Sequence, residues 1–136
     1  MSDSNILLEV VTPERLLISQ PVQMVMAVGT EGAMGILPGH VPLLAALKIS
    51  ELRWLVEDHE QKAAISGGFM EVTPAKVSIL VESAELATDI DEERTIQAKR
   101  RAEERLQRAK DGAPDIDIVR AERALQKSIT RLKVLK

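Results

Sequence analysis

The 136 residues, of which 45% are apolar and 1% aromatic, suffice for one or two small domains with cores of aliphatic side chains. The chain has no cysteine, which excludes disulfides, thiolate metal sites and cysteine nucleophiles, and it has no apolar run near the ~20 residues of a membrane-spanning helix. A net charge of −3 and a pI near 5.5 argue against a nucleic-acid-binding protein, which usually presents a strongly basic face.

Composition changes near residue 88. Residues 1–87 hold 5 basic and 11 acidic residues, whereas residues 88–136 hold 13 basic and 10 acidic ones. Six of the seven glycines and five of the six prolines also lie in the first part. We therefore expect two domains, 1–87 and 88–136, with different partners.

The first part alternates between β-rich segments and turn residues. The expected strands are residues 6–11, 15–19, 22–28, 49–56, 61–65, 69–72 and 77–81. Short strands at this spacing predict an all-β sandwich or barrel. Residues 22–28 are apolar on both faces, so we expect this strand to be covered on both sides, either within the chain or by another subunit.

The segment E-G-A-M-G-I-L-P-G-H-V-P-L-L, from Glu31 to Leu44, interrupts this series. Its three glycines suit bends and close backbone approaches, and its two prolines belong at edges, bulges and turns. We expect a bent ribbon at a sheet edge. The composition of this segment is equally consistent with a bulged hairpin in a β-sandwich that has no functional role.

From Asp89 onward the apolar period is helical. The first helix has the stripe Ala98, Ala102, Leu106 and Ala109, begins at an Asp89 or Asp91 cap, and ends at Lys110. After a Gly112–Pro114 turn, the second helix follows Asp115 and Asp117, and its stripe is Ile118, Ala121, Leu125, Ser128, Leu132 and Leu135. The predicted fold is α+β: an N-terminal β-sandwich followed by a C-terminal antiparallel two-helix hairpin.

The chain shows no catalytic motif. It has no phosphate-binding loop of the G-x-x-x-x-G-K-[ST] type, and Ser66 lies in I-S-G-G rather than in a nucleophile elbow. His40 and His59 lack the spacing of metal ligands, so we expect His59 in a solvated turn and His40 in a local hydrogen bond. The acidic cluster 89–93 is expected to cap a helix rather than to bind a cation.

Several segments together resemble the epsilon subunit of F-type ATP synthases. Besides Glu31–Leu44 they are L-E-V-V-T-P-E-R (8–15), A-I-S-G-G-F-M-E-V-T-P (64–74), D-I-D-E-E-R (89–94), A-K-R-R-A-E-E-R-L (98–106), D-I-D-I-V-R-A (115–121) and T-R-L-K-V (130–134). They occur in the family's order over essentially the whole chain.

The resemblance implies a non-catalytic rotor subunit of the central stalk, which couples ion-driven ring rotation to ATP synthesis and inhibits ATP hydrolysis through its C-terminal helices. The implied partners are the gamma subunit and the c-ring, and the alpha and beta subunits when the hairpin extends. The implied location is peripheral, at the cytoplasmic face of the bacterial inner membrane, with membrane contact only through the complex. The alternative is a stand-alone ATP-sensing module whose hairpin folds on nucleotide.

The resemblance also implies three sets of site residues. Contact with the c-ring is expected at Glu31, Met34 and His40. No cofactor is required, but ATP is expected as a regulatory ligand, because Ile90, Asp91 and Arg94 match the family motif I/L-D-x-x-R-A, in which Thr95 here replaces alanine. The other expected nucleotide-binding residues are Glu85, Arg101, Lys127 and Arg131. Contact with the beta subunits is expected at Arg94, Arg101, Arg105, Arg120 and Arg123, although a solvated helical face would carry the same charges.

Overall fold

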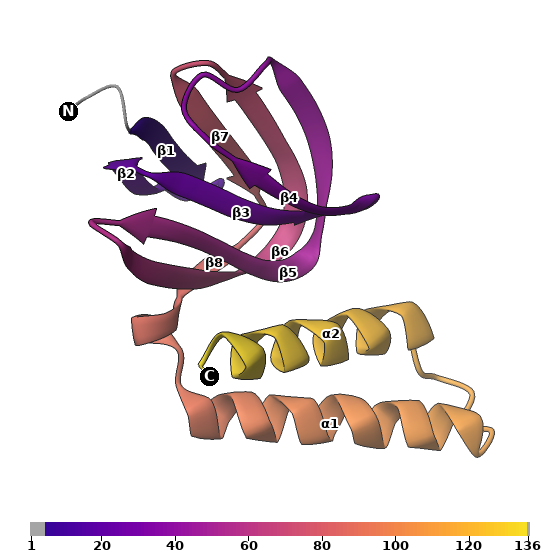
Figure 1. Ribbon diagram of the computed structural model, residues 1–136. Helices are drawn as coiled ribbons and strands as arrows, with labels where there is room; N and C mark the ends of the chain where they lie inside the picture. Colours follow the sequence, from indigo (N-terminus) through magenta and orange to yellow (C-terminus); the bar gives the residue numbers. More distant parts are fainter. Residues whose placement is uncertain (1–4, 136) are drawn as a thin grey trace.

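The computed structural model, which describes residues 5–135, has a strand-rich part followed by two helices (Figure 1). Its elements are β1 (Ile6–Val11), β2 (Leu16–Val22), β3 (Met24–Gly29), β4 (Gly32–Ile36), β5 (Leu43–Val56), β6 (His59–Thr73), β7 (Lys76–Val81), β8 (Ala84–Leu86), the 3-10 helix η2 (Ala87–Asp89), α1 (Glu92–Lys110) and α2 (Ile118–Val134). The predicted fold class, a β-sandwich followed by an antiparallel helical hairpin, is confirmed.

The strands form one sheet that curls over itself. Its order is β2-β1-β7-β6-β5-β3-β4, and β8 pairs with β6. Only β1 and β7 pair in parallel among the described strands. The curl brings the end of β2 back to β5, where the Gln23 backbone N–H donates to the Leu55 carbonyl at 2.8 Å. The predicted edge position of the Glu31–Leu44 ribbon is correct, because β4 is the last strand in this order.

Two glycines bend β6, and the face of the strand that points into the core changes at the bend. Ala63 and Ile65 are buried before the bend, whereas Met70 and Val72 are buried after it, so the inward face changes from odd to even positions. Gly67 and Gly68 have φ angles of +96° and +146°, and a Cβ on Gly68 would lie 2.1 Å from the Leu80 carbonyl oxygen. The prediction of two separate strands here is therefore wrong, since the glycines bend one continuous strand.

The segment 22–28 is divided rather than forming one strand. Val22 closes β2 and Met24 opens β3. Val25 and Ala27 point into the sandwich core, while the opposite face of β3 is half-buried. That outer face and residues of α2 line a shared cavity of about 540 Å³, so the hairpin supplies part of the cover that two apolar faces require.

The sandwich core consists of large aliphatic side chains around one indole. Its fully buried members, by decreasing volume, include Trp54, Ile6, Leu8, Ile36, Leu52, Ile65, Met70 and Ile79. The Trp54 Nε1–H donates to Gln61 Oε1 at 3.2 Å, so burial leaves no unsatisfied indole donor. This core holds in place the strands whose outer faces and connecting loops carry the candidate sites.

Both helices begin at aspartate caps. The Asp91 carboxylate accepts from the Arg94 backbone N–H at 3.1 Å, and the Asp117 carboxylate accepts from that of Arg120 at 3.0 Å. The first helix also ends at Lys110, as predicted. Of the two caps considered for α1, Asp91 is therefore the one that the fold uses.

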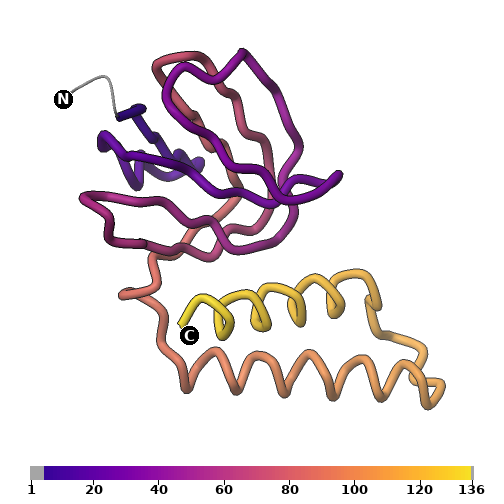
Figure 2. Tube along the Cα trace, viewed as in Figure 1, coloured from indigo at the N-terminus to yellow at the C-terminus, as the bar shows by residue number. Residues whose placement is uncertain are grey.

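In space, α2 lies between the sandwich and α1 (Figures 1 and 2). The predicted stripe fails in part, and this position explains the burial of residues outside the stripe. Ile118 is 49% exposed, whereas Thr130 and Val134, outside the stripe, are buried. A single stripe describes a helix with one covered side, but α2 has a second covered side facing the sandwich.

Candidate functional site

A cavity of about 250 Å³ opens beside the first turns of α1. Its lining comes from β8, η2, α1 and α2 and from the residue that caps α1: Glu85, Asp89, Asp91, Arg94, Thr95, Ala98, Arg101 and Arg131. The antiparallel packing of the helices brings Arg131, near the end of α2, next to Arg94 and Arg101 on α1. Five of the seven residues expected to bind nucleotide thus line one cavity.

The other two expected residues lie outside this lining. Lys127, one turn before Arg131, lines two adjoining cavities that Arg131 also borders. Ile90 is buried and packs with Ala64 and Val134, so its side chain supports the junction between the sandwich and the helices. Ile90 therefore does not face the cavity in this structure.

The cavity has equal numbers of positive and negative side chains, and some of them already interact with other groups of the protein. Three arginines face three carboxylates in the lining. Arg131 Nε donates to Glu85 Oε1 at 2.5 Å, while the Asp91 carboxylate is occupied by the α1 cap. Thr95, at the position where the motif has alanine, is buried and donates its hydroxyl to the Asp91 carbonyl at 2.8 Å. Its added hydroxyl is therefore satisfied within the helix.

The five arginines expected to contact beta subunits are all exposed: Arg94, Arg101, Arg105, Arg120 and Arg123. Within residues 5–135, none of them forms an ion pair. Arg120 and Arg123 border a cavity of about 570 Å³ between the helices, together with Lys127 and Arg131. The structure thus presents a solvated basic face whose contact with another subunit stays a prediction.

The residues expected at the c-ring are spread along the sheet edge. Glu31 is exposed in the turn before β4, Met34 lies half-buried within β4, and His40 follows in the loop before β5. At about 3.4 Å per residue, the first and last residues of the five-residue β4 lie about 14 Å apart. His40 Nδ1 lies 2.7 Å from its neighbour's carbonyl oxygen, at Val41, which bears out the expected local hydrogen bond.

His59 is exposed at the start of β6, and its Nδ1 lies 3.0 Å from the Glu57 carbonyl oxygen. Residues 5–135 contain no group of three or more His, Cys, Asp or Glu side chains arranged to hold a metal ion. In the same part of the chain, no helix is long and apolar enough to cross a membrane.

Sequence reasoning missed a row of exposed and half-buried apolar side chains on the outer face of the sandwich. Phe69 is 55% exposed and Leu80 is 50% exposed, and the two are direct cross-strand neighbours. Leu80 in turn pairs with Val11, which pairs with Leu16. We call Leu16, Val11, Leu80 and Phe69 the apolar row. The available signal was the apolar pair Phe69-Met70, because only one of two adjacent strand residues can face the core.

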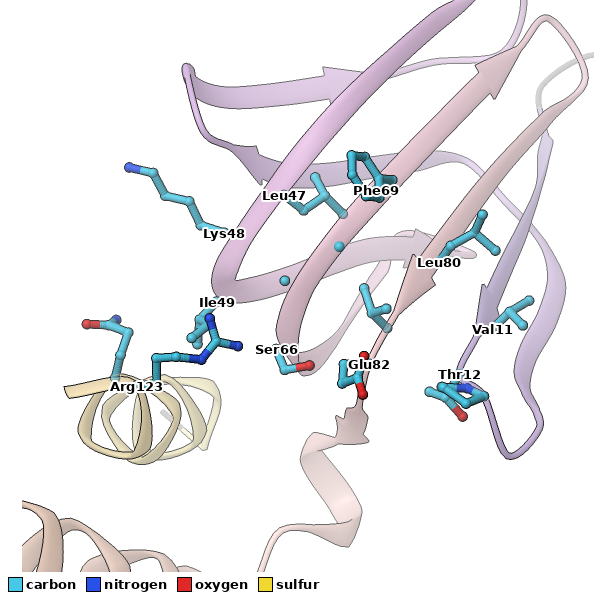
Figure 3. Close-up of a pocket in the computed structure, with 15 residues that line it drawn as sticks. Val11, Thr12, Leu47, Lys48, Ile49, Ser66, Phe69, Leu80, Glu82 and Arg123 are labelled. Carbon is cyan, nitrogen blue, oxygen red and sulfur yellow. The ribbon is translucent and has the colours of Figure 1, made fainter. Parts of the chain in front are cut away.

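Three of the four residues of the apolar row border an open groove of about 1190 Å³ (Figure 3). Phe69, Leu80 and Val11 lie on the sheet side, whereas Arg123 approaches from α2. A second exposed apolar group, Leu37, Val41 and Leu44, flanks His40 and was likewise assigned to no site. Contiguous exposed apolar side chains of this kind are typical of protein contacts.

Comparison with known proteins covers the chain in two adjoining parts. The β-sandwich domain model of the ATP synthase delta/epsilon chain matches residues 5–87, and the long α-helix domain model of the same chain matches residues 88–136. The ATP synthase epsilon chain of Bacillus licheniformis is 46% identical over 125 residues, which cover 92% of this chain and 93% of that protein. The ATP synthase epsilon chain of Desulforapulum autotrophicum is 47% identical over 132 residues, covering 96% of each chain.

Among solved structures, a chain in the cryo-EM structure of the Euglena gracilis mitochondrial ATP synthase, in its OSCP/F1/c-ring part, superimposes with a TM-score of 0.80. It is 27% identical, and the superposition covers 98% of this chain and 82% of that one. The similarity therefore includes the sandwich, the helices and their relative placement.

Proposed function

The chain belongs to the ATP synthase delta/epsilon family, and we propose that it is the epsilon subunit of the central stalk of a bacterial F-type ATP synthase. It performs no chemistry itself. It couples ion-driven rotation of the ring to ATP synthesis, and its C-terminal helices restrain ATP hydrolysis. The observation that carries this proposal is the match of both parts of the chain to relatives named as epsilon chains of ATP synthase.

The proposed partners are those that the family resemblance implies, and the exposed surfaces support the proposal. The sandwich binds the gamma subunit and rests on the c-ring, and the apolar row and the Leu37–Leu44 group supply apolar surface for such contacts. Glu31, Met34 and His40 lie at or near the ring. When the hairpin extends, its exposed arginines meet the alpha and beta subunits. The chain reaches the membrane only through this complex, at the cytoplasmic face of the inner membrane.

We further propose that ATP is a regulatory ligand of the hairpin. The supporting observation is the cavity that gathers Arg94, Arg101 and Arg131 from both helices. Phosphate groups bridging these side chains favour the compact arrangement, because a ligand shifts an equilibrium toward the state that it binds better. Lysine at position 127 lacks the bidentate fork of arginine, so we expect a dissociation constant in the high micromolar to millimolar range. The stand-alone ATP-sensing module is not favoured, since the relatives are subunits of a synthase.

Removal of the hairpin from the assembled enzyme tests the restraint on hydrolysis. A subunit ending at residue 87 should leave ATP synthesis in place and raise ATP hydrolysis, because the sandwich provides the coupling contacts and the hairpin the inhibition. Unchanged hydrolysis in membranes carrying the shortened subunit would remove the inhibitory role. Failure of the full-length chain to co-purify with gamma would remove the proposed place in the stalk.

Cross-linking tests the orientation of the sandwich. Cysteine is introduced at Glu31 or Met34, which is possible without background because the chain has none. Both variants should cross-link to the polar loop of the ring in the assembled enzyme. Cysteine at Glu14, in the exposed turn between β1 and β2, is the matched control. Products formed only with the catalytic head would show that the sandwich is inverted.

A further inference from the structure

Arg131 connects the hairpin to the sandwich through charge. It projects from the last turns of α2 to Glu85 on β8, a residue 46 positions earlier in the chain. Its side chain is 28% exposed and that of Glu85 is 38% exposed, so the pair is partly shielded from water. We call this ion pair the clamp. The junction also contains a small apolar cluster around Ala64, Ile90 and Val134.

The same guanidinium also belongs to the cavity that holds Arg94 and Arg101. Its Nε is engaged by the Glu85 carboxylate, whose negative charge lies in the lining as well. Arg94 and Arg101 form no ion pair with any of residues 5–135. Of the three arginines, Arg131 is thus the one whose charge is already offset inside the protein.

We propose that Glu85 competes with bound phosphate for Arg131, so that the clamp controls access of anions to the cavity. This inference rests on the proposed ATP site. A polyphosphate entering the cavity attracts Arg131 and repels Glu85, and both effects weaken the clamp. Phosphate binding therefore exchanges a contact between α2 and β8 for one between α2 and α1. The hairpin stays compact, and the apolar cluster of Ala64, Ile90 and Val134 still joins it to the sandwich.

The exchange is reciprocal. If phosphate weakens the clamp, a weaker clamp must raise phosphate affinity by the same factor. Glu85→Gln keeps the size of the side chain and removes the charge. Asp89→Asn is the matched control, because Asp89 lines the same cavity but makes no ion pair with any described residue. It subtracts the same charge and leaves the clamp in place.

The experiment titrates inorganic tripolyphosphate into the full chain, the Glu85→Gln variant and the Asp89→Asn variant, with binding followed by calorimetry. We expect Glu85→Gln to bind about tenfold more tightly, equivalent to about 1.4 kcal/mol. Asp89→Asn should gain no more than about threefold. A probe without base or ribose is used because Glu85 can also accept a hydrogen bond from a nucleoside, which would mask the competition in an ATP titration.

Amide hydrogen exchange of the ligand-free proteins gives the second readout. Residues 127–135 should exchange several-fold faster in Glu85→Gln and at the original rate in Asp89→Asn. The proposal is overturned if exchange in Glu85→Gln is unchanged, or if the two variants gain equal affinity, which would show a simple effect of net charge. Failure of the proposed ATP site is distinguishable, because it appears as no saturable binding of ATP or tripolyphosphate to any of the three proteins, whereas failure of the clamp appears as unchanged exchange in Glu85→Gln.

Discussion

The sandwich and the hairpin are held together by different kinds of side chain. The sandwich buries leucine, isoleucine, valine, methionine and tryptophan in one continuous core. The helices bury Thr95 and Ala102 on α1 against Ala121 and Ser128 on α2. Full burial of a large aliphatic side chain contributes about 1.5–3 kcal/mol, and an alanine methyl contributes much less. The two parts of one short chain therefore differ widely in how firmly they are packed.

The polar residues of the hairpin seam keep their hydrogen bonds inside their own helices. The Thr95 hydroxyl donates to the Asp91 carbonyl, and the Ser128 hydroxyl donates to the Ala124 carbonyl at 3.0 Å. Neither bond crosses from one helix to the other. Separation of the helices thus breaks no such bond and exposes little apolar surface, which lowers the cost of opening. The seam is suited to a part that changes its arrangement.

Core truncation should have the largest effect and should separate the two regions. Leu52→Ala removes a fully buried side chain of the sandwich and should cost about 2–5 kcal/mol of unfolding free energy in a urea titration. Leu106→Ala, at a half-buried position of α1, should cost less than about 1 kcal/mol. Equal losses at the two positions would contradict the contrast between a dense core and a thin seam.

Removal of the helices should leave the sandwich folded. A chain of residues 1–87 retains the whole sandwich core, and the cluster that it loses contains few side chains. We expect a β-type circular dichroism spectrum and a cooperative melt a few degrees below that of the full chain. Residues 88–136 alone should show little helix, because their seam is small. A random-coil spectrum from residues 1–87 would show instead that the hairpin is required for the fold.

Sequence reasoning found the elements whose signals are local. Asp91, Lys110 and Asp117 mark helix ends through capping and charge, and the alanines of α1 mark its buried side. Alternation of apolar residues located most strands. These features depend on neighbours within about four residues and can be read without knowledge of the tertiary fold.

Features set by distant contacts were not predictable in the same way. The continuity of β6 through Gly67 and Gly68 depends on the Leu80 carbonyl passing close by. The burial of Thr130 depends on the sandwich lying across α2. The Glu85–Arg131 clamp joins residues far apart in sequence, and composition gave no reason to pair these two among many charges. Resemblance to a family named both residues, but only the structure shows them bound to each other.

Docking of the hairpin should respond to one valine. Val134→Ala removes two methyl groups from the cluster with Ala64 and Ile90, and should cost about 1–2 kcal/mol of docking free energy. The loss should appear as faster amide exchange in α2 with little change in the sandwich. Ile129→Ala is the matched control, because Ile129 is on the same helix but exposed. If the control accelerates exchange as much as Val134→Ala, the cluster does not anchor α2.

The smallest expected effect concerns the helix caps, and it tests whether the two helices contribute equally to the hairpin. Asp91→Ala should cost about 1 kcal/mol, because the Arg94 N–H loses its acceptor at the start of α1. Asp117→Ala removes the equivalent bond to Arg120. Since α2 also packs on the sandwich and α1 packs mainly on α2, loss of the Asp91 cap should fray more residues. Amide exchange at residues 92–98 should therefore accelerate strongly in Asp91→Ala. Exchange at residues 118–124 should accelerate less in Asp117→Ala. The reverse order would show that α2, the helix next to the sandwich, is the less stable of the two.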